Sequence, residues 1–269
     1  MTHSSPFKGS IPEHYDHYLG PMFFEPYAIE VVSHIDPSVV NVALEIGAGT
    51  GVVTRHLRNV LSKNAKLIAS DISPDMLERA KEKLKGQNID WQILEATQLP
   101  FEDKSIDLVV CCFAYMFVED KSKAFAEAYR VLKPGGMFLF TTWDKLELNE
   151  ASHTFRKIVK EYLADSLPPN FKLPFAFNDP DEMKNLLTKA GFSSVDIDSV
   201  EKLSVCSTAK EAATGLARGG SLYQEIMNRN PAWIEEICEK LEKELAEKYG
   251  EPVQASMRAV VGKAIASKL

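Results

Sequence analysis

The segment Leu44-Glu45-Ile46-Gly47-Ala48-Gly49-Thr50-Gly51 follows an apolar run and precedes a helical pattern. Glycines in such a turn allow a sharp change of direction and let a ligand approach the backbone. The free N–H groups at the start of the following helix favour a negatively charged group. The dinucleotide-binding fingerprint has glycines at its first, third and sixth positions, but the sixth position here is Val52. The turn therefore predicts a strand-to-helix ligand site with the different spacing Gly-x-Gly-x-Gly.

Short apolar runs continue on both sides of this turn. They predict buried strands at residues 42–47, 66–71, 90–94, 106–112 and 136–142, separated by helical patterns at 51–62, 74–85 and 120–132. Strands that alternate with helices form βαβ units, in which helices cover both faces of a parallel sheet. Residues 193–200 and 203–207 predict two more strands as a closing, hairpin-like pair. We therefore expect an α/β fold with a seven-stranded sheet and helices on both faces.

The spacing of elements changes after the fifth strand. Residues 145–178 contain a helical pattern and a proline- and aromatic-rich loop, which is longer than a plain connection requires. We predict that this insertion is a cap over a substrate and that the sheet domain covers residues 41–207. Residues 208–269 are predicted to be helical throughout, as a C-terminal extension. Its apolar stripe packs on the sheet domain or forms a homodimer face; the stripe consists of Trp233, Ile234, Ile237, Leu241 and Leu245.

The composition excludes several classes of protein. The chain has 269 residues, 45% hydrophobic and 26% charged, which is ordinary for a globular protein. The uncharged stretch Leu108–Val118 has 11 residues, fewer than the roughly 20 that a membrane-spanning helix needs. The first ten residues lack the basic start and apolar core of a secretory signal, so we expect a cytoplasmic protein. The four cysteines include no Cys-x-x-Cys pair, which disfavours a disulfide scaffold and a structural zinc site.

The distribution of charge bears on the partners. The net charge is −7, and seven glutamates against three lysines between Glu235 and Glu251 account for most of it. We find no cluster of Lys and Arg that would follow a phosphate backbone, so we expect no nucleic-acid partner. His14 and His17 have a His-x-x-His spacing but lack a third ligand, so we expect no metal site.

Several polar and aromatic residues follow the predicted strands. Asp71 ends the second strand, 20 residues after Gly51. An acid there can accept both hydroxyls of a ribose, or it can simply begin the turn into Ser73-Pro74. Glu95-Ala96-Thr97 ends the third strand, and Cys112-Phe113 ends the fourth. Because ligands of open α/β sheets bind at the carboxyl ends of the strands, we expect these segments to meet at one site.

Four stretches together resemble the class I S-adenosylmethionine-dependent methyltransferases, in the branch similar to the ubiquinone/menaquinone-biosynthesis C-methyltransferases. They are LEIGAGTG (44–51), SDISPDMLERA (70–80), LEATQLPFEDKSID (94–107) and RVLKPGGMFLFTTWD (130–144). The resemblance implies a Rossmann-like methyltransferase sheet and S-adenosyl-L-methionine as the cofactor. It also implies an N-terminal helical lid over residues 1–40, in which Tyr15 and Tyr18 close over the cofactor.

The same resemblance assigns roles to the residues around the turn. The methionine portion of the cofactor would lie against Glu45, Gly47, Ala48, Gly49, Thr50 and Gly51. Asp71 would bind the ribose, and Ile72 and Met76 would cover the adenine face. The adenine edge would meet Glu95, Ala96 and Thr97, and the sulfonium end would lie between Cys112 and Phe113. At position 95 the family more often has Asp.

Methyl transfer is an in-line displacement, so the enzyme must mainly hold the acceptor about 3–3.5 Å from the methyl carbon. We predict transfer to a small-molecule acceptor, aromatic or apolar, catalysed mainly by proximity. If the acceptor must lose a proton, His153 in the cap is the candidate base because imidazole titrates near neutrality. Tyr115 is the candidate for orienting an acceptor oxygen.

Two alternatives from other classes share these motifs. A nicotinamide-dependent oxidoreductase has the same strand, glycine turn and ribose acid, but it requires glycine at the sixth position of the turn. A non-catalytic or regulatory S-adenosylmethionine-binding protein would keep the whole set and use its C-terminal helices as a partner surface. A nucleic-acid amino-methyltransferase would carry Asn/Asp-Pro-Pro-aromatic after the fourth strand, where this chain has Cys-Cys-Phe-Ala-Tyr.

Overall fold

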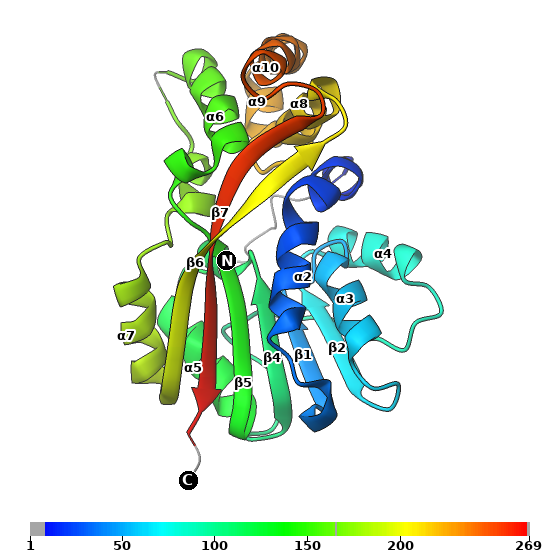
Figure 1. The fold of residues 1–269 in the computed structure, drawn as a ribbon, viewed down its shortest axis with the longest axis vertical. Coiled ribbons are helices and arrows are strands. Elements are labelled where there is room, and N and C mark those ends of the chain that lie inside the picture. Colours follow the sequence, from blue (N-terminus) through cyan, green and yellow to red (C-terminus); the bar gives the residue numbers. More distant parts are fainter. Residues whose placement is uncertain (1–8, 165, 268–269) are drawn as a thin grey trace.

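The seven-stranded sheet is present in the computed structural model, which describes residues 9–164 and 166–267 (Figure 1). The strand order is β3-β2-β1-β4-β5-β7-β6. The first five strands in this order are parallel: β3 (Asp90–Ile93), β2 (Lys66–Asp71), β1 (Val42–Ile46), β4 (Ile106–Cys112) and β5 (Leu132–Trp143). Strand β7 (Val253–Ala266) pairs antiparallel with both β5 and β6 (Phe192–Cys206). The predicted α/β, Rossmann-like fold class is confirmed.

Helices cover both faces of the sheet (Figure 1). On one face lie α2 (Glu25–Ser33), α3 (Val52–Val60) and α4 (Pro74–Lys83), and on the other lie α5 (Lys121–Val131) and α7 (Pro180–Ala190). Within β4, Leu108 and Val110 face the α2–α3 layer, whereas Val109 and Cys111 face the α5–α7 layer. Strands buried on both faces read as continuous apolar runs, which is why the parallel half could be recognised in the sequence.

A second group of helices lies at one end of the molecule, around the projecting halves of β6 and β7 (Figure 1). It consists of α6 (Glu150–Tyr162), α8 (Ala209–Arg218), α9 (Tyr223–Arg229) and α10 (Trp233–Tyr249). The stripe residues Ile234, Ile237, Leu241 and Leu245 of α10 are buried inside this chain, and Trp233 packs against Tyr162 with ring centroids 5.6 Å apart. The stripe is therefore part of the core of this helical group.

The prediction that residues 208–269 are helical throughout is wrong. Residues 253–266 form β7, which lies inside the sheet between β5 and β6, so residue 207 does not end the sheet domain. The segment is rich in alanine, a residue with high helix propensity, and its pairing with two strands overrides that local preference. The predicted hairpin of 193–200 and 203–207 is also wrong, because β6 is one continuous strand whose partner is β7.

The predicted N-terminal lid and the cap insertion are built mostly from short helical pieces. The described part of residues 1–40 contains α1 (Ile11–His14), the π-helix η1 (Tyr15–Phe24), α2 and η2 (Pro37–Val39); residues 1–8 lie outside the described residues. The predicted cap contains η4 (Leu146–Leu148), α6, η5 (Pro169–Phe171) and η6 (Leu173–Phe175), and η3 (Tyr115–Phe117) follows β4.

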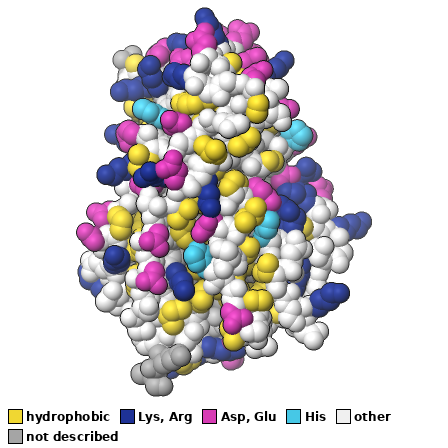
Figure 2. All heavy atoms as spheres, in the orientation of Figure 1, with side chains coloured by type: hydrophobic (Ala, Val, Ile, Leu, Met, Phe, Trp, Pro, Cys, Tyr) yellow, Lys and Arg dark blue, Asp and Glu magenta, His cyan; other side chains and the backbone are white. Residues whose placement is uncertain are grey.

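The surface in the view of Figure 2 carries Lys and Arg side chains intermingled with Asp and Glu side chains. None of the helices in the described part of the chain combines the length and the apolar character needed to cross a bilayer.

Candidate active site

One large cavity lies at the carboxyl ends of the parallel strands, and its volume is about 1220 Å³. One side of its wall comes from the turn after β1, from the segments that follow β2, β3 and β4, and from η1. The opposite side comes from α6, η5, η6 and the α8–α9 connection, and includes Phe155, Arg156, Asn170, Phe175 and Leu222. The cavity thus joins the sheet to the helical group at the end of the molecule.

The glycine turn forms part of this wall, and its glycines have positive φ angles, which other residues avoid. Gly47 has φ +74° and Gly51 has φ +82°. A Cβ atom on Gly47 would lie 2.3 Å from the Cβ of Ala114, so the turn after β1 can approach the turn after β4 only without a side chain. Gly51 lies behind the wall, where a Cβ would lie 3.1–3.2 Å from side-chain atoms of Leu84 and Ala80.

Asp71 is held in a fixed orientation at the end of β2. Its Oδ2 accepts a hydrogen bond from the Gly49 N–H at 2.8 Å, and its Oδ1 accepts one from the Ser73 N–H at 2.8 Å. Burial raises the pKa of this carboxyl group, while the backbone N–H donors act in the opposite direction. A carboxylate has about four acceptor positions, so two oxygens that each bind one backbone donor can still accept two ligand hydroxyls.

Glu45 is the second acid beside the turn, and it lies beneath the cavity wall. Its side chain is buried, with 1% of the residue exposed, and Oε2 has no hydrogen-bond partner among the described residues. Burial, together with the negative charge of Asp71, raises the pKa of Glu45 to about 8. A carboxyl group with this pKa keeps its proton at neutral pH, and a buried polar atom without a partner is rare in native proteins.

Aromatic side chains close the cavity next to the turns. Phe113, at the end of β4, has φ 55°, which is strained for a residue other than glycine, and its ring stacks on Trp143 with centroids 4.2 Å apart. Tyr15 stacks on Phe24 at 4.8 Å. Burial, and then the negative charge of Asp71, raise the pKa of Tyr15, in line with a position close to that carboxylate.

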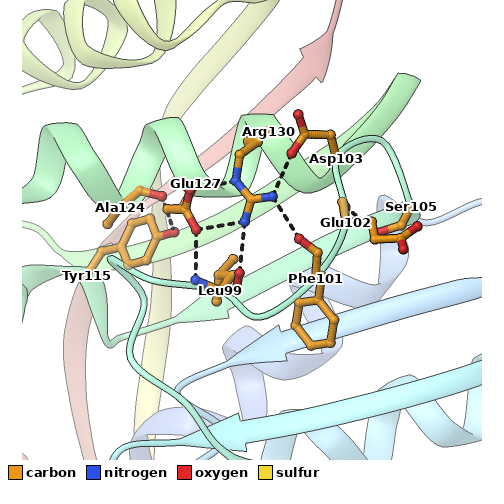
Figure 3. A network of polar contacts seen from close by, with 9 residues as sticks. All are labelled: Leu99, Phe101, Glu102, Asp103, Ser105, Tyr115, Ala124, Glu127 and Arg130. Atoms are coloured by element: carbon orange, nitrogen blue, oxygen red, sulfur yellow. Dashed lines mark hydrogen bonds and ion pairs between the residues drawn. The ribbon is translucent and has the colours of Figure 1, made fainter.

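The loop after β3 is held against α5 by hydrogen bonds around Arg130 (Figure 3). Arg130 donates to the carbonyl oxygens of Leu99, at 2.8 Å, and Phe101, at 2.7 Å. It also donates to the carboxylate of Glu127, which in turn accepts a hydrogen bond from the Leu99 N–H at 2.7 Å. These contacts fix the loop that brings residues 95–97 to the cavity wall.

Most of the predicted cofactor-binding residues lie together on this wall. These are Tyr15, Gly47, Gly49, Asp71, Ile72, Met76, Glu95, Ala96, Thr97, Cys112 and Phe113. Four others lie behind the wall and support the turn: Glu45, Ala48, Thr50 and Gly51.

Tyr18, which was predicted to close over the cofactor, does not line the cavity. It packs on α8, where a Cβ atom on Gly215 would lie 2.6 Å from the Tyr18 Cβ. The reason is the π-helical winding of η1, which directs Tyr15, Leu19 and Phe23 to the cavity instead.

The two predicted catalytic residues differ in position. His153 is exposed and lies outside the cavity, a position that does not support the predicted role as a base. Tyr115 does line the cavity, but its hydroxyl donates to the Ala124 carbonyl oxygen at 3.2 Å within the core (Figure 3). Burial raises the pKa of Tyr115 well above its usual value, and its hydroxyl proton is donated to Ala124, so it is not available to orient an acceptor oxygen in this structure.

Sequence reasoning missed the polar residues on the far side of the cavity. Arg156 and Ser152 of α6, Asn170 of η5 and Ser221 all line it. The signal that was available for Arg156 is its position in the helical pattern of α6, where it lies between the buried residues Phe155 and Ile158.

The fold and the cavity define a class of protein, a Rossmann-like domain with a ligand site at the carboxyl ends of its parallel strands. Residues 44–140 match the family model described as "Methyltransferase domain", and this confirms the resemblance to the methyltransferases. The chain is 32% identical over 170 residues to the ubiquinone/menaquinone biosynthesis C-methyltransferase UbiE of Pseudoalteromonas translucida (strain TAC 125). The matched region covers 55% of this chain and 65% of that protein, so the chain spans a little less than two thirds of this relative's length.

Solved structures share the fold at lower sequence identity. The structure of Haemonchus contortus phosphoethanolamine N-methyltransferase 2, with phosphomonomethylethanolamine and S-adenosylhomocysteine, matches with a TM-score of 0.60 at 18% identity, over 95% of this chain and 57% of that chain. The cyclase SpnF matches with a TM-score of 0.57 at 17% identity, over 90% of this chain and 81% of that chain. Likeness at this level shows the fold alone, because proteins of one fold carry out different chemistry.

Proposed function

We propose that the protein binds S-adenosyl-L-methionine at the glycine turn and transfers its methyl group to a small-molecule acceptor in the far half of the same cavity. The observation that carries this proposal is the continuity of the cavity, whose wall runs from Gly47 and Asp71 to Phe155 and Phe175. Pockets for one small ligand usually measure about 300–1,000 Å³, and about 1220 Å³ leaves room for a cofactor and an acceptor together.

The residues present fit this cofactor. Asp71 has a fixed carboxylate with free acceptor positions for the two ribose hydroxyls. A Cβ atom at Gly47 would obstruct the turn that receives the methionine portion. Glu45 lies behind the same turn and supports it from below the cavity wall.

The cofactor, when bound, supplies a methyl group bonded to a cationic sulfur for in-line displacement. The protein's task is then to position the acceptor and exclude water. Phe113 and Trp143 form a rigid aromatic wall, and the faces of such rings tolerate a cation well. Among the described residues, no histidine lines the cavity, which favours catalysis by proximity. The aromatic wall also favours an acceptor with an aromatic or apolar body.

The rival interpretation is a non-catalytic protein that only binds the cofactor. It predicts a cavity filled by one ligand, and the volume beyond the turn argues against it. Turnover distinguishes the two, since an enzyme converts S-adenosylmethionine to S-adenosylhomocysteine in the presence of an acceptor. Phenols and quinols, including members with acidic substituents, are the first compounds to assay.

Cofactor binding itself is tested by calorimetric titration with S-adenosylhomocysteine. We expect micromolar affinity for the wild type and about 10- to 100-fold weaker binding for Asp71→Asn, because hydrogen bonds to a charged group contribute about 1.5–3 kcal/mol. The matched control is Asp75→Asn, which makes the same change at an exposed position on α4 outside the cavity. Thermal unfolding of each variant separates lost binding from lost folding. No binding of S-adenosylhomocysteine together with binding of NADH would refute the proposal in favour of an oxidoreductase.

A further inference from the structure

The wall of the cavity opposite the glycine turn contains a buried cation without a counter-ion. Arg156 of α6 lines the cavity, and 7% of the residue is exposed. It makes no hydrogen bond or ion pair with any described residue, and its buried Nε atom has no acceptor. Its guanidinium group lies over the rings of Phe171 and Phe175, at 5.5 Å and 5.1 Å from their centroids.

This arrangement is unfavourable for the protein alone. Removing a cation from water is costly, and contact with two aromatic faces compensates only part of that cost. Burial lowers the pKa of Arg156 to about 10, so the group is still charged at pH 7. Arg130 pairs with Glu127 and Asp103, and Arg258 pairs with Glu201. Arg58, which is also buried, donates to the carbonyl oxygens of Leu61 and Ala65. A charge kept unpaired on a cavity wall indicates that its partner is a ligand.

The surroundings of Arg156 offer further polar contacts for such a ligand. Asn170 lines the cavity from η5, next to Phe171, and its buried Oδ1 has no partner, while its Nδ2 donates to the Ser221 carbonyl oxygen at 2.9 Å. Ser152 lies one turn before Arg156 on α6 and also lines the cavity. The other buried part of this wall is aromatic and apolar, so the site combines one cation, a few neutral polar groups and flat apolar surface.

The acids on the same wall have other partners. Asp71 binds the backbone of the glycine turn, Glu95 accepts a hydrogen bond from Thr97 at 2.6 Å, and Asp120 caps α5 through the Lys123 N–H at 2.9 Å. Lys121 and Lys123 are further cations of the wall. Lys121 donates to the Val118 carbonyl oxygen at 2.9 Å, and Lys123 is exposed to solvent. Arg156 is therefore the buried cation of this wall that the described structure leaves without a partner.

We propose that the methyl acceptor carries a carboxylate that pairs with Arg156 while its aromatic or apolar body lies against Phe171, Phe175 and the neighbouring rings. This inference rests on the proposed function and names the substrate class of that site. A planar carboxylate matches the fork of a guanidinium group through two parallel hydrogen bonds. A singly charged anion balances the buried charge of Arg156, whereas a phosphate dianion would bring an uncompensated negative charge against the aromatic rings.

The test compares matched acids and amides on protein saturated with S-adenosylhomocysteine. We titrate three acids, each beside its amide: benzoate, 4-hydroxybenzoate and 3-phenylpropionate beside benzamide, 4-hydroxybenzamide and 3-phenylpropanamide. Phenyl phosphate serves as the doubly charged comparison compound. We expect at least one acid to bind the wild type about 10-fold or more tightly than its amide, since hydrogen bonds to charged groups are stronger than neutral ones. Equal binding of acids and amides, or tighter binding of phenyl phosphate, would overturn the proposal without any variant.

Arg156→Met and Arg156→Lys assign the preference to this residue. The preference for the acid should disappear in the methionine variant. It should weaken in the lysine variant, which keeps the charge but lacks the two parallel N–H donors of the guanidinium group. The matched control is Lys157→Met, which removes a positive charge from the adjacent exposed position on α6 and should keep the preference. We also expect Arg156→Met to unfold at the same or a higher temperature than the wild type, because it removes an unpaired buried charge.

The other outcomes separate this proposal from the proposed function. If Arg156→Met folds but loses S-adenosylhomocysteine binding, Arg156 belongs to the cofactor site and the carboxylate proposal fails. If the wild type binds the cofactor product but has no preference for acids, the proposed function stands and the carboxylate proposal falls. If the wild type binds no S-adenosylhomocysteine, the proposed function fails, and the acid–amide comparison on the free protein still decides whether Arg156 binds a carboxylate.

Discussion

Replacing Glu45 by glutamine should make the protein more stable at neutral pH and flatten the dependence of its stability on pH. The Glu45 carboxyl group is buried beneath the glycine turn, and Oε2 has no partner among the described residues. Burial raises its pKa in the folded protein to about 8, from about 4.5 for an exposed glutamate. The folded state therefore holds a proton that the unfolded state releases between these two values.

The sign and size of the effect follow from this difference. The stability that comes from keeping the proton is fully present below about pH 4.5 and is lost as the pH rises towards the folded pKa of about 8. Each pH unit between these values costs about 1.4 kcal/mol, so Glu45 lowers the free energy of unfolding by about 3 kcal/mol between pH 4.5 and pH 7. Glutamine has a similar shape and does not titrate, so the Glu45→Gln variant escapes this loss.

The assay is urea unfolding of both proteins at pH 5, 6, 7 and 8, followed by tryptophan fluorescence in the absence of cofactor. The difference in unfolding free energy between variant and wild type should grow by about 3 kcal/mol from pH 5 to pH 7 and level off near pH 8. Glu239→Gln makes the same change at an exposed position on α10 and should show no such growth. Parallel pH profiles for the wild type and Glu45→Gln would refute the reasoning, since they would mean that Glu45 is already ionised in the folded protein.

Three further substitutions test other parts of the structure. His153→Ala should leave the rate of methyl transfer within about two-fold of the wild type, because the side chain is exposed and outside the cavity; a loss of about 100-fold or more would restore it as a base. Tyr115→Phe should lower the unfolding free energy in urea by about 1 kcal/mol through loss of the hydrogen bond to Ala124, and calorimetry should find the affinity for S-adenosylhomocysteine unchanged. Gly262→Ala should cost about 1–3 kcal/mol or more, because its Cβ would lie 2.1 Å from the Phe140 ring; an unchanged melting temperature in a thermal scan would show that the ring can move aside.

The parallel half of the fold could be predicted because its signals are local. Strands β2 and β4 have the predicted bounds, 66–71 and 106–112, since strands buried on both faces are continuous apolar runs. Helix α7 also has local signals at both ends, because Asp179 caps its start and Gly191, with φ +114°, ends it. Each of these signals lies within a few residues of the feature that it determines.

The antiparallel edge could not be predicted in the same way. Strand β6 lies at the edge of the sheet and is mostly exposed, so its apolar pattern is weak and is interrupted at Glu201-Lys202. Strand β7 contains alanines that also suit a helix, and it becomes a strand only through pairing with β5 and β6. Those partners are far away in the sequence, and no local pattern encodes their pairing.

The two halves of the cavity differ in the same way: one is built from local sequence motifs, and the other is built from contacts between distant segments. The residues after β1, β2, β3 and β4 are fixed by motifs in their own segments, and most of them line the cavity as predicted. The far wall combines α6, η5 and η6, which precede β6 in the sequence, with the α8–α9 connection, which follows it. Contacts between segments that are distant in the sequence bring these elements together. The acceptor half of the site therefore depends on contacts that the sequence does not show directly.

One feature of α6 could nevertheless have been predicted from its own periodicity. His153, Lys157 and Lys160 recur at helical spacing and are all exposed, so they mark the face of α6 in contact with water. Imidazole in general suits a base near neutral pH, which is why the sequence favours His153, but its position on that polar stripe places it in solvent. Arg156 is the charged residue that departs from the stripe, and it is buried on the cavity wall. A charge is costly to bury. A charged residue on the apolar side of an amphipathic helix, such as Arg156, therefore indicates a ligand more strongly than a histidine on the polar side.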